Sequence, residues 1–241
     1  MSLPDVVYVV KAEGDNDELR YSLRTLQNIP HGKVWLVGHR PRWAVNVEHL
    51  PTRNHLPTKY QNSTANLLTA CTHDDVADEV IYMNDDFFIL RPLDRIPHLH
   101  MGPVENRVRY YDTKYERRVN GAGRYRDGMV QTADLLRSWG VADVLSYEVH
   151  APMLIDRRKM AEAINRAARE ARIVALHKRT LYGNLYRVGG ELVKDVKVLT
   201  STHTWGERQR FVSTSNQSWR SGSVGKRIRR LFAEPSAYER S

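Results

Sequence analysis

Short β-branched segments alternate with an amphipathic helix over residues 1–90 of the chain. Three apolar runs of strand length lie in this region: Asp5–Val10 (DVVYVV), Lys33–Val37 (KVWLV) and Glu79–Met83 (EVIYM). Between the first two runs, residues 17–28 place Leu19, Leu23 and Leu26 on one face of a predicted helix. This alternation predicts an α/β fold with a mostly parallel, doubly wound sheet flanked by helices.

The remainder of the chain shows weaker patterns. Helices are predicted over Gln61–Cys71 and Arg157–Arg172, and a late strand over Asp195–Leu199. Residues 38–57 are expected to form loops around a short strand, and residues 91–140, rich in Arg, Tyr and Gly, to be irregular. Because the sequence contains no internal repeat and no low-complexity linker, we expect one compact domain.

Composition restricts the possible partners without choosing one. Of the 37 basic residues 28 are arginine, and the formal net charge is +9. Arginine binds phosphate through a planar, bidentate fork, so the excess suits a phosphate-bearing partner. Nucleic acid, a nucleotide sugar and an anionic membrane all fit this charge, and arginine-rich codon usage is an alternative origin of the excess.

The sequence also bears on location. It contains no apolar run of about 18 residues, which argues against a transmembrane helix. The first residues show neither a basic flank nor a long apolar run, so we expect no signal peptide. The lone cysteine, Cys71, rules out an internal disulfide, and we expect a cytoplasmic location.

An acidic segment follows the third strand directly. It consists of Asn84, Asp85 and Asp86. Ligands of open α/β sheets bind at the carboxyl ends of strands, and hard cations such as Mg²⁺ or Mn²⁺ prefer oxygen ligands. Extended residues alternate sides, so Asn84 and Asp86 are expected to share a face, with Asp86 as the direct metal ligand against a diphosphate. A turn with acidic caps and no metal is the alternative.

The segment Asp15–Leu26 (DNDELRYSLRTL) contains a second candidate cluster. Arg20 and Arg24 share one helix face, and Asp15 or Asn16 is a natural N-cap. The helix follows the first strand, so its N-terminus should face the same sheet edge as residues 84–86. We therefore expect the two segments to meet at one anion-binding pocket; a solvated face with local ion pairs is the alternative.

Two further residues have side chains suited to catalysis. His150 can act as a base near neutral pH. Arg179, in the HKRTLYGN segment that ends at Asn184, can neutralise a phosphoryl group during transfer. A surface or packing role is the alternative for His150. The basic residues 226–230 could contact nucleic acid or membrane, or form a solvated helix.

Taken together, these segments resemble the Stealth family, which includes bacterial capsule polymerases and the N-acetylglucosamine-1-phosphotransferase that marks lysosomal enzymes. The resemblance is ordered along most of the chain, and its motifs are DVVY (5–8), DNDELRYSLR (15–24), LPT (56–58), YMNDDFF (82–88), HAP (150–152), Arg179 and LFAEPSAYE (231–239). The chain departs from the family at residues 9–14, which read VVKAEG where the family has an aspartate in TWVDG.

The resemblance implies a GT-A-like core and a nucleotide-sugar donor, with UDP-sugars favoured. It implies transfer of hexose-1-phosphate to a hydroxyl group of a glycan or protein, assisted by Mg²⁺ or Mn²⁺. It divides the domain into a nucleotide-binding half (1–90), an acceptor and catalytic half (91–205) and a basic C-terminal segment (206–241). The implied site residues are Asp15, His150 and Arg179 for catalysis, Asn16, Arg20, Arg24 and Asn184 for donor phosphate, and Asn84, Asp85 and Asp86 for metal.

The residues are also compatible with two other functions. A GT-A glycosyltransferase would use the same donor and the same acidic segment, but would transfer the sugar itself. A nucleic-acid-binding module would account for the net charge of +9. It is not favoured, because the sequence shows neither a helix-turn-helix nor a zinc pattern, nor aromatic residues interleaved with basic ones.

Overall fold

The central sheet contains every strand predicted over residues 1–90. A computed structural model describes residues 2–11, 14–115 and 121–240. The sheet has the order β3-β2-β1-β4-β7. Its strands are β1 (Asp5–Val10), β2 (Val34–Gly38), β3 (Glu48–Leu50), β4 (Glu79–Asn84) and β7 (Met153–Asp156). Every neighbouring pair is parallel except β4 and β7, so the predicted mostly parallel sheet is confirmed.

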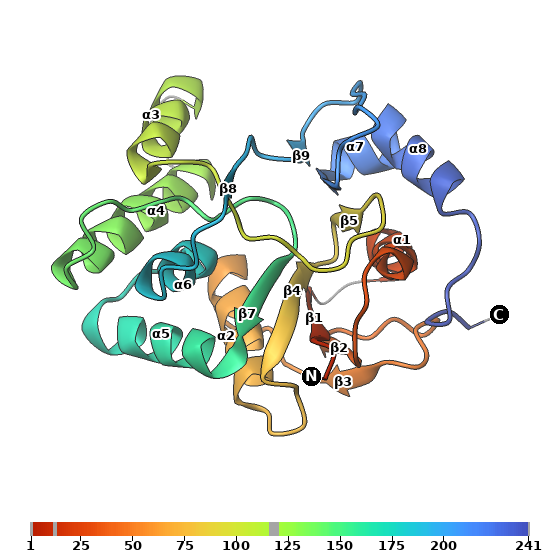
Figure 1. The fold of residues 1–241 in the computed structure, drawn as a ribbon, viewed down its shortest axis with the longest axis horizontal. Helices are drawn as coiled ribbons and strands as arrows, with labels where there is room; N and C mark the ends of the chain where they lie inside the picture. Colours follow the sequence, from red (N-terminus) through yellow and green to blue (C-terminus); the bar gives the residue numbers. More distant parts are fainter. Residues whose placement is uncertain (1, 12–13, 116–120, 241) are drawn as a thin grey trace.

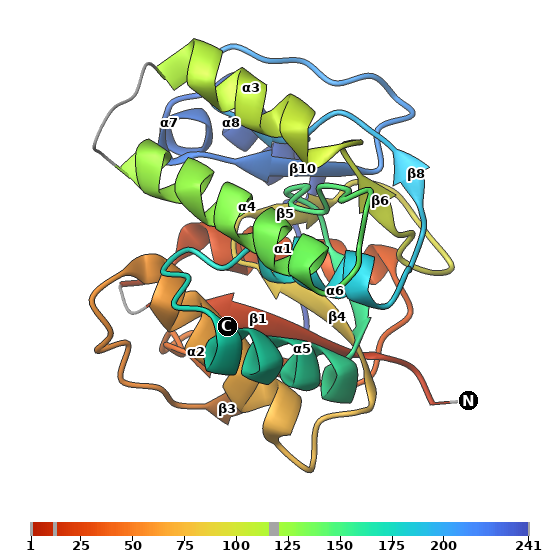
Figure 2. The ribbon, with the colours of Figure 1, turned by 90° about the vertical axis from the view of Figure 1, so that its left-hand side faces the viewer.

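Helices cover both faces of this sheet (Figures 1 and 2). On one face lies α1 (Asp17–Arg24), which continues as the 3-10 turn η1 (Thr25–Asn28). On the other lie α2 (Lys59–Thr72) and α5 (Arg157–Glu170). Side chains of β1 alternate between the two layers: Val6, Tyr8 and Val10 pack with α1, and Val7 and Val9 pack with α2 and α5.

Helix α1 begins where the sequence predicts it. Asn16 is the N-cap, with a φ of 43°, and its side chain accepts a hydrogen bond from the Leu19 backbone N–H at 3.2 Å. Leu19, Leu23 and Leu26 are at most 1% exposed, as the apolar spacing requires. The last predicted turn tightens into η1, which positions Thr25 to donate its hydroxyl to the Ser22 carbonyl.

The prediction that residues 91–140 are irregular is wrong. They contain β6 (Leu99–His100) and two helices, α3 (Val104–Tyr115) and α4 (Gly121–Ser138), which share an apolar core with α5 and with α6 (Lys178–Leu185). Each helix buries only a narrow apolar stripe, and polar or charged residues interrupt the apolar pattern along its sequence. Gly128 lies inside α4 because a Cβ there would stand 2.1 Å from the Ala175 carbonyl oxygen. This glycine permits close packing and does not break the helix.

A second, smaller sheet gathers distant parts of the chain. Its order is β5-β10-β9, and its strands are β5 (Phe87–Ile89), β10 (Phe211–Thr214) and β9 (Lys197–Val198), the last within the predicted strand 195–199. Helices α7 (Asn216–Arg220) and α8 (Ser223–Leu231) pack on it, as Figure 1 shows. A two-stranded sheet joins β6 to β8 (Glu191–Leu192). Beyond α8 the chain returns to the first half, where the Arg240 N–H donates to the Trp43 carbonyl.

The basic C-terminal segment is partly a packing element. Val224 and Ile228 of α8 are fully buried against the smaller sheet, and Arg229 lies over the Trp219 ring at 4.4 Å.

In the part of the chain that the structure describes, no helix combines the length and apolar character needed to cross a bilayer.

Candidate active site

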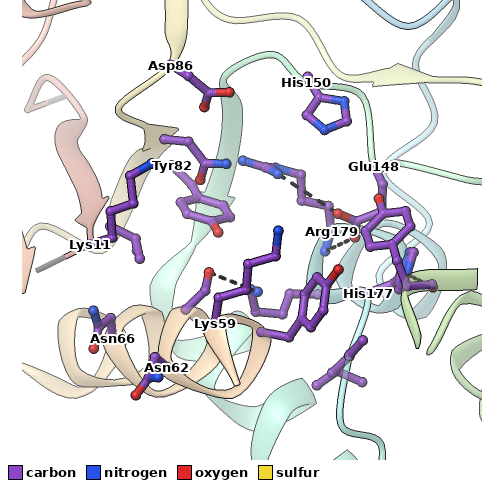
Figure 3. A pocket seen from close by; sticks show the side chains of 18 of the residues that line it. Lys11, Lys59, Asn62, Asn66, Tyr82, Asp86, Glu148, His150, His177 and Arg179 are labelled. Carbon is purple, nitrogen blue, oxygen red and sulfur yellow. Dashed lines mark hydrogen bonds and ion pairs between the residues drawn. The ribbon is translucent and has the colours of Figure 1, made fainter. Parts of the chain in front are cut away.

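A cavity of about 940 Å³ opens at the carboxyl ends of β1 and β4. Its other walls come from α2, α3, α4, β9, the start of α6 and the segments 148–150 and 175–177. Figure 3 shows Asp86 and His150 at one rim and Lys59 and Asn62 of α2 at the opposite side. The position is the one at which open α/β sheets bind ligands.

The acidic segment lies at this cavity as predicted. Asn84 ends β4, and Asp85 and Asp86 form the turn before β5; all three line the cavity. Asp85 is 9% exposed, and its Oδ2 accepts a hydrogen bond from the Asn16 amide at 2.8 Å. Burial, together with the neighbouring Asp86 carboxylate, raises the pKa of Asp85. The turn and the N-terminus of α1 therefore meet, as expected. Residues 15–26 do not line the cavity, however, so the anion-binding pocket expected between the two segments is not found there.

Asp86 forms an ion pair within the protein. Its Oδ2 contacts the Lys197 ammonium and accepts the Ser213 hydroxyl at 3.0 Å. Burial by itself would raise the pKa of Asp86, but the positive charge and hydrogen bond of Lys197 hold it below its usual value. Lys197 comes from β9 and Ser213 from β10, where the two residues are paired in register. Three segments distant in sequence thus converge on one carboxylate.

Arg179 brings a buried guanidinium to the cavity. It is 6% exposed and lies in the first turn of α6, with its Cζ 4.2 Å from the centre of the Tyr82 ring and 5.1 Å from that of Phe87. Nη1 is 3.9 Å from a Glu148 carboxylate oxygen. Among the described residues, Nε and Nη2 have no hydrogen-bond partner. Buried donors without partners are costly, so these atoms indicate a site for an anionic ligand.

Glu148 holds the N-terminus of α6 in place. Its Oε1 accepts the backbone N–H groups of Arg179 at 3.0 Å and Thr180 at 3.2 Å. Burial would raise the pKa of Glu148, but the basic groups of His177, Arg179 and Lys178 and the hydrogen bond from Thr180 keep it below its usual value. An ionised carboxylate at this position caps the helix and fixes the backbone from which Arg179 extends.

His150 is oriented by a carboxylate that the sequence did not indicate. Its Nδ1 is 3.0 Å from both Asp195 oxygens, and its backbone N–H donates to Oδ1 at 3.2 Å. Burial opposes ionisation of Asp195, but the contacts with His150 lower its pKa. A carboxylate beside Nδ1 favours the proton on that nitrogen, which leaves Nε2 as the atom able to accept one. Since His150 also lines the cavity, it is suited to serve as a base there.

Comparison with known proteins identifies the fold. The structure of the galactosyltransferase LgtC in complex with donor and acceptor sugar analogs matches with a TM-score of 0.50 and 12% identity, over 97% of this chain and 96% of LgtC. The chain has a GT-A glycosyltransferase fold. An active-site mutant of LgtC gives a TM-score of 0.52 and 11% identity over the same shares of the two chains. No family model matches the sequence, and neither does any curated protein.

Arg24 was predicted to bind donor phosphate, but in the structure its guanidinium is hydrogen-bonded to the C-terminal segment. Its Nε and Nη2 donate to the two Glu239 oxygens at 2.8 and 2.7 Å. Its Nη1 donates to the carbonyls of Phe232 at 2.9 Å and Ala233 at 2.6 Å. These bonds use the guanidinium to hold the C-terminal segment, so Arg24 lies outside the cavity lining.

Four more predicted residues also lie outside the cavity lining. Asn16, predicted to bind donor phosphate, instead caps α1 and donates its amide to Asp85 at 2.8 Å. Arg20 lies over the Trp43 ring at 4.7 Å and 4.0 Å from Glu239. Asp15 is exposed, and its carbonyl accepts the Trp43 indole N–H. Asn184 bonds through both side-chain atoms to backbone groups, including the Leu145 N–H at 2.8 Å and carbonyl at 2.7 Å. The contacts of these residues lie within the fold, whereas the family resemblance implied a role at the ligand.

Several cavity residues were missed by the sequence analysis. They include basic and aromatic residues, among them Lys11, Lys59, Tyr60, Tyr125, Lys178 and Lys197. Lys11 directly follows β1, at the sheet edge where ligands were expected, so its position carried a usable signal. Lys197 and Asp195 carried none, because a lysine and an aspartate in a short late strand are indistinguishable from surface residues until the strand is placed.

Proposed function

We propose that this chain is a transferase that takes a nucleotide-sugar donor, with UDP-sugars favoured, and binds its diphosphate in the cavity beside β1 and β4. The observation that carries the proposal is the buried Arg179 guanidinium, whose Nε and Nη2 have no partner among the described residues. A diphosphate supplies the oxygen atoms that these donors require. The GT-A fold and the position of the cavity support the same donor class.

The finer proposal is hexose-1-phosphate transfer, consistent with the resemblance to the Stealth family. His150 Nε2 removes the proton of an acceptor hydroxyl, and Asp195 stabilises the resulting imidazolium. The acceptor oxygen attacks the phosphorus that bears the sugar. The bond from that phosphorus to the bridging oxygen breaks, and nucleoside monophosphate leaves. Arg179 balances the charge that develops on the transferred phosphoryl group. The acceptor would be a glycan or protein hydroxyl.

The residues of the predicted Mg²⁺ or Mn²⁺ site do not fit a divalent ion as they are paired. Asp86 is bound by the Lys197 ammonium and the Ser213 hydroxyl, and Asp85 by the Asn16 amide. Across residues 2–11, 14–115 and 121–240, no three His, Cys, Asp or Glu side chains are grouped to hold a metal. The proposed transfer therefore involves no metal ion.

Glycosyl transfer is the second candidate, and the fold similarity to the galactosyltransferase LgtC favours it. In this reaction the acceptor oxygen attacks the anomeric carbon. The bond from that carbon to the diphosphate breaks, and nucleoside diphosphate leaves. The same cavity residues would bind the donor, so the two candidates differ in the bond broken and in the nucleotide released.

A binding and product assay tests the proposal. UDP, UDP-glucose, UDP-galactose and UDP-N-acetylglucosamine are titrated while the melting temperature is followed, because a ligand of the native state raises it. The donor that binds is then incubated with the chain, and the released nucleotide is separated by chromatography. UMP supports phosphoryl transfer, and UDP supports glycosyl transfer.

A matched pair of variants completes this test. Arg179→Met should weaken binding of UDP about tenfold or more, because one charge-assisted contact is lost. Arg169→Met, which removes an exposed arginine of α5, should leave binding unchanged. If none of these nucleotides shifts the melting temperature, or if both variants bind UDP as the wild type does, the proposed function is wrong.

A further inference from the structure

The ammonium of Lys197 occupies the side of the acidic turn where a divalent ion was expected. It contacts Asp86 Oδ2, and both side chains are largely buried, at 21% and 15% exposed. Both residues line the cavity, together with Asp85. A cation is therefore already present at the carboxylate that the sequence analysis assigned to metal.

This lysine is held in position by its backbone and its neighbours. The Lys197 N–H donates to Asp195 Oδ1 at 3.3 Å, and β9 pairs in parallel with β10, with Ser213 opposite Lys197. Ser213 donates to the same Asp86 oxygen at 3.0 Å, and the Thr214 N–H donates to the Asp86 carbonyl at 3.2 Å. The smaller sheet thus fixes the carboxylate and its ammonium partner as one unit.

The charges around the cavity make a further cation unnecessary. Five lysine and arginine side chains line it, besides two histidines that are counted as neutral: Lys11, Lys59, Lys178, Arg179 and Lys197. Three acidic side chains line it: the two aspartates of the turn and Glu148. The formal excess is two positive charges among the described lining residues. A diphosphate diester carries one negative charge on each phosphoryl group, so the excess matches the donor without a metal ion.

We propose that Lys197 is the resident cation of the donor site, contacting the donor diphosphate directly while paired with Asp86, so that binding and transfer proceed without a divalent metal. The inference rests on the proposed function, because it names the group that meets the donor's diphosphate. Asp86 acts here as a positioning residue for the ammonium. A flexible lysine can reach a phosphate oxygen with one N–H group while another remains on Asp86, whose Oδ2 also accepts the Ser213 hydroxyl.

The first experiment uses the unmodified chain and needs no variant. Binding of Mn²⁺ alone is followed by the loss of the free-ion electron paramagnetic resonance signal, and binding of UDP is measured by calorimetry in EDTA and in Mn²⁺. We expect no specific Mn²⁺ binding, and equal UDP affinity in both buffers within about twofold. Specific Mn²⁺ binding that Asp86→Asn abolishes, or UDP binding that requires Mn²⁺, would overturn the inference.

The second experiment removes the ammonium. Lys197→Met should weaken UDP binding in EDTA about tenfold or more and should create Mn²⁺ binding at the uncovered Asp86 carboxylate. Lys197→Arg keeps the charge and should retain most of the affinity. Lys194→Met, an exposed lysine of the same segment, should behave as the wild type. Unaltered UDP affinity in folded Lys197→Met would contradict the inference.

The two proposals fail in different ways. If UDP binds the wild type only with Mn²⁺, the nucleotide-sugar function stands and the role of Lys197 is wrong. If neither UDP nor the UDP-sugars bind in either buffer, the function itself is wrong and Lys197 has no donor to contact.

Discussion

Glu18 gives the protein a pH-dependent stability that one substitution should remove. It lies in the first turn of α1, and its Oε1 accepts the Thr214 hydroxyl at 2.6 Å. Burial raises the pKa of Glu18 from its ordinary value of 4.5 to about 7, and the nearby Asp86 and Asp85 carboxylates add to the shift. The native state therefore retains a proton that the unfolded chain releases at lower pH.

The sign and size of the effect follow from this difference in proton binding. Because the folded pKa is the higher one, the contribution of Glu18 to stability is complete below pH 4.5 and is lost as the pH rises through about 7. The gap between the two pKa values sets an upper limit of about 3 kcal/mol. We expect about 1–2 kcal/mol, since solvent around the partly exposed carboxyl group screens its charge.

Glu18→Gln should remove this pH dependence, because the amide resembles the protonated carboxyl group and can still accept the Thr214 hydroxyl. Urea unfolding at pH 4, below both pKa values, should give nearly equal free energies for wild type and variant. At pH 8 the variant should be more stable by about 1–2 kcal/mol. Glu234→Gln, at an exposed position, is the control and should follow the wild type at both pH values. A wild type and Glu18→Gln with parallel pH dependence would refute the reasoning.

Three further substitutions separate structural residues from site residues. Arg24→Met should lower the free energy of unfolding by roughly 3 kcal/mol, since it leaves Glu239 without its bidentate partner, yet the folded variant should keep the wild-type affinity for UDP in calorimetry. Arg179→Lys should reduce turnover of the donor about 10²-fold with little change in melting temperature, because lysine cannot reproduce the guanidinium fork; turnover within twofold of wild type would contradict this. Asp195→Asn should lower kcat more than KM and shift the pH profile of kcat by removing the charge beside His150, and an unchanged profile would contradict the assignment of His150 as the base.

Local patterns predicted the parts of the fold whose signal is local. The predicted strand Asp5–Val10 begins and ends at the same residues as β1. The spacing of Leu19, Leu23 and Leu26 predicted the buried face of α1 and η1. The acidic turn was correctly expected at a strand end beside the N-terminus of α1. Helices α3 and α4 were missed because their apolar stripes are narrow and because glycine in a helix is ordinarily unfavourable.

Partners of charged side chains could not be predicted in the same way. Arg20 and Arg24 share a helix face as expected, but whether that face meets a ligand or another segment depends on where the C-terminus returns. Spacing in sequence cannot distinguish these outcomes, because a phosphate and a carboxylate attract a guanidinium by the same interaction.

The sequence alone predicted the first strands, the first helix, the mostly parallel sheet and the placement of Asn84–Asp86 at a strand end, because hydrophobic periodicity and capping act between residues a few positions apart. Only the tertiary structure decided which charges meet. Asp86 is paired with Lys197 across 111 positions, and Arg24 with Glu239 across 215. Coulombic and hydrogen-bond partners depend on distance in space, and the packing of the two sheets sets that distance.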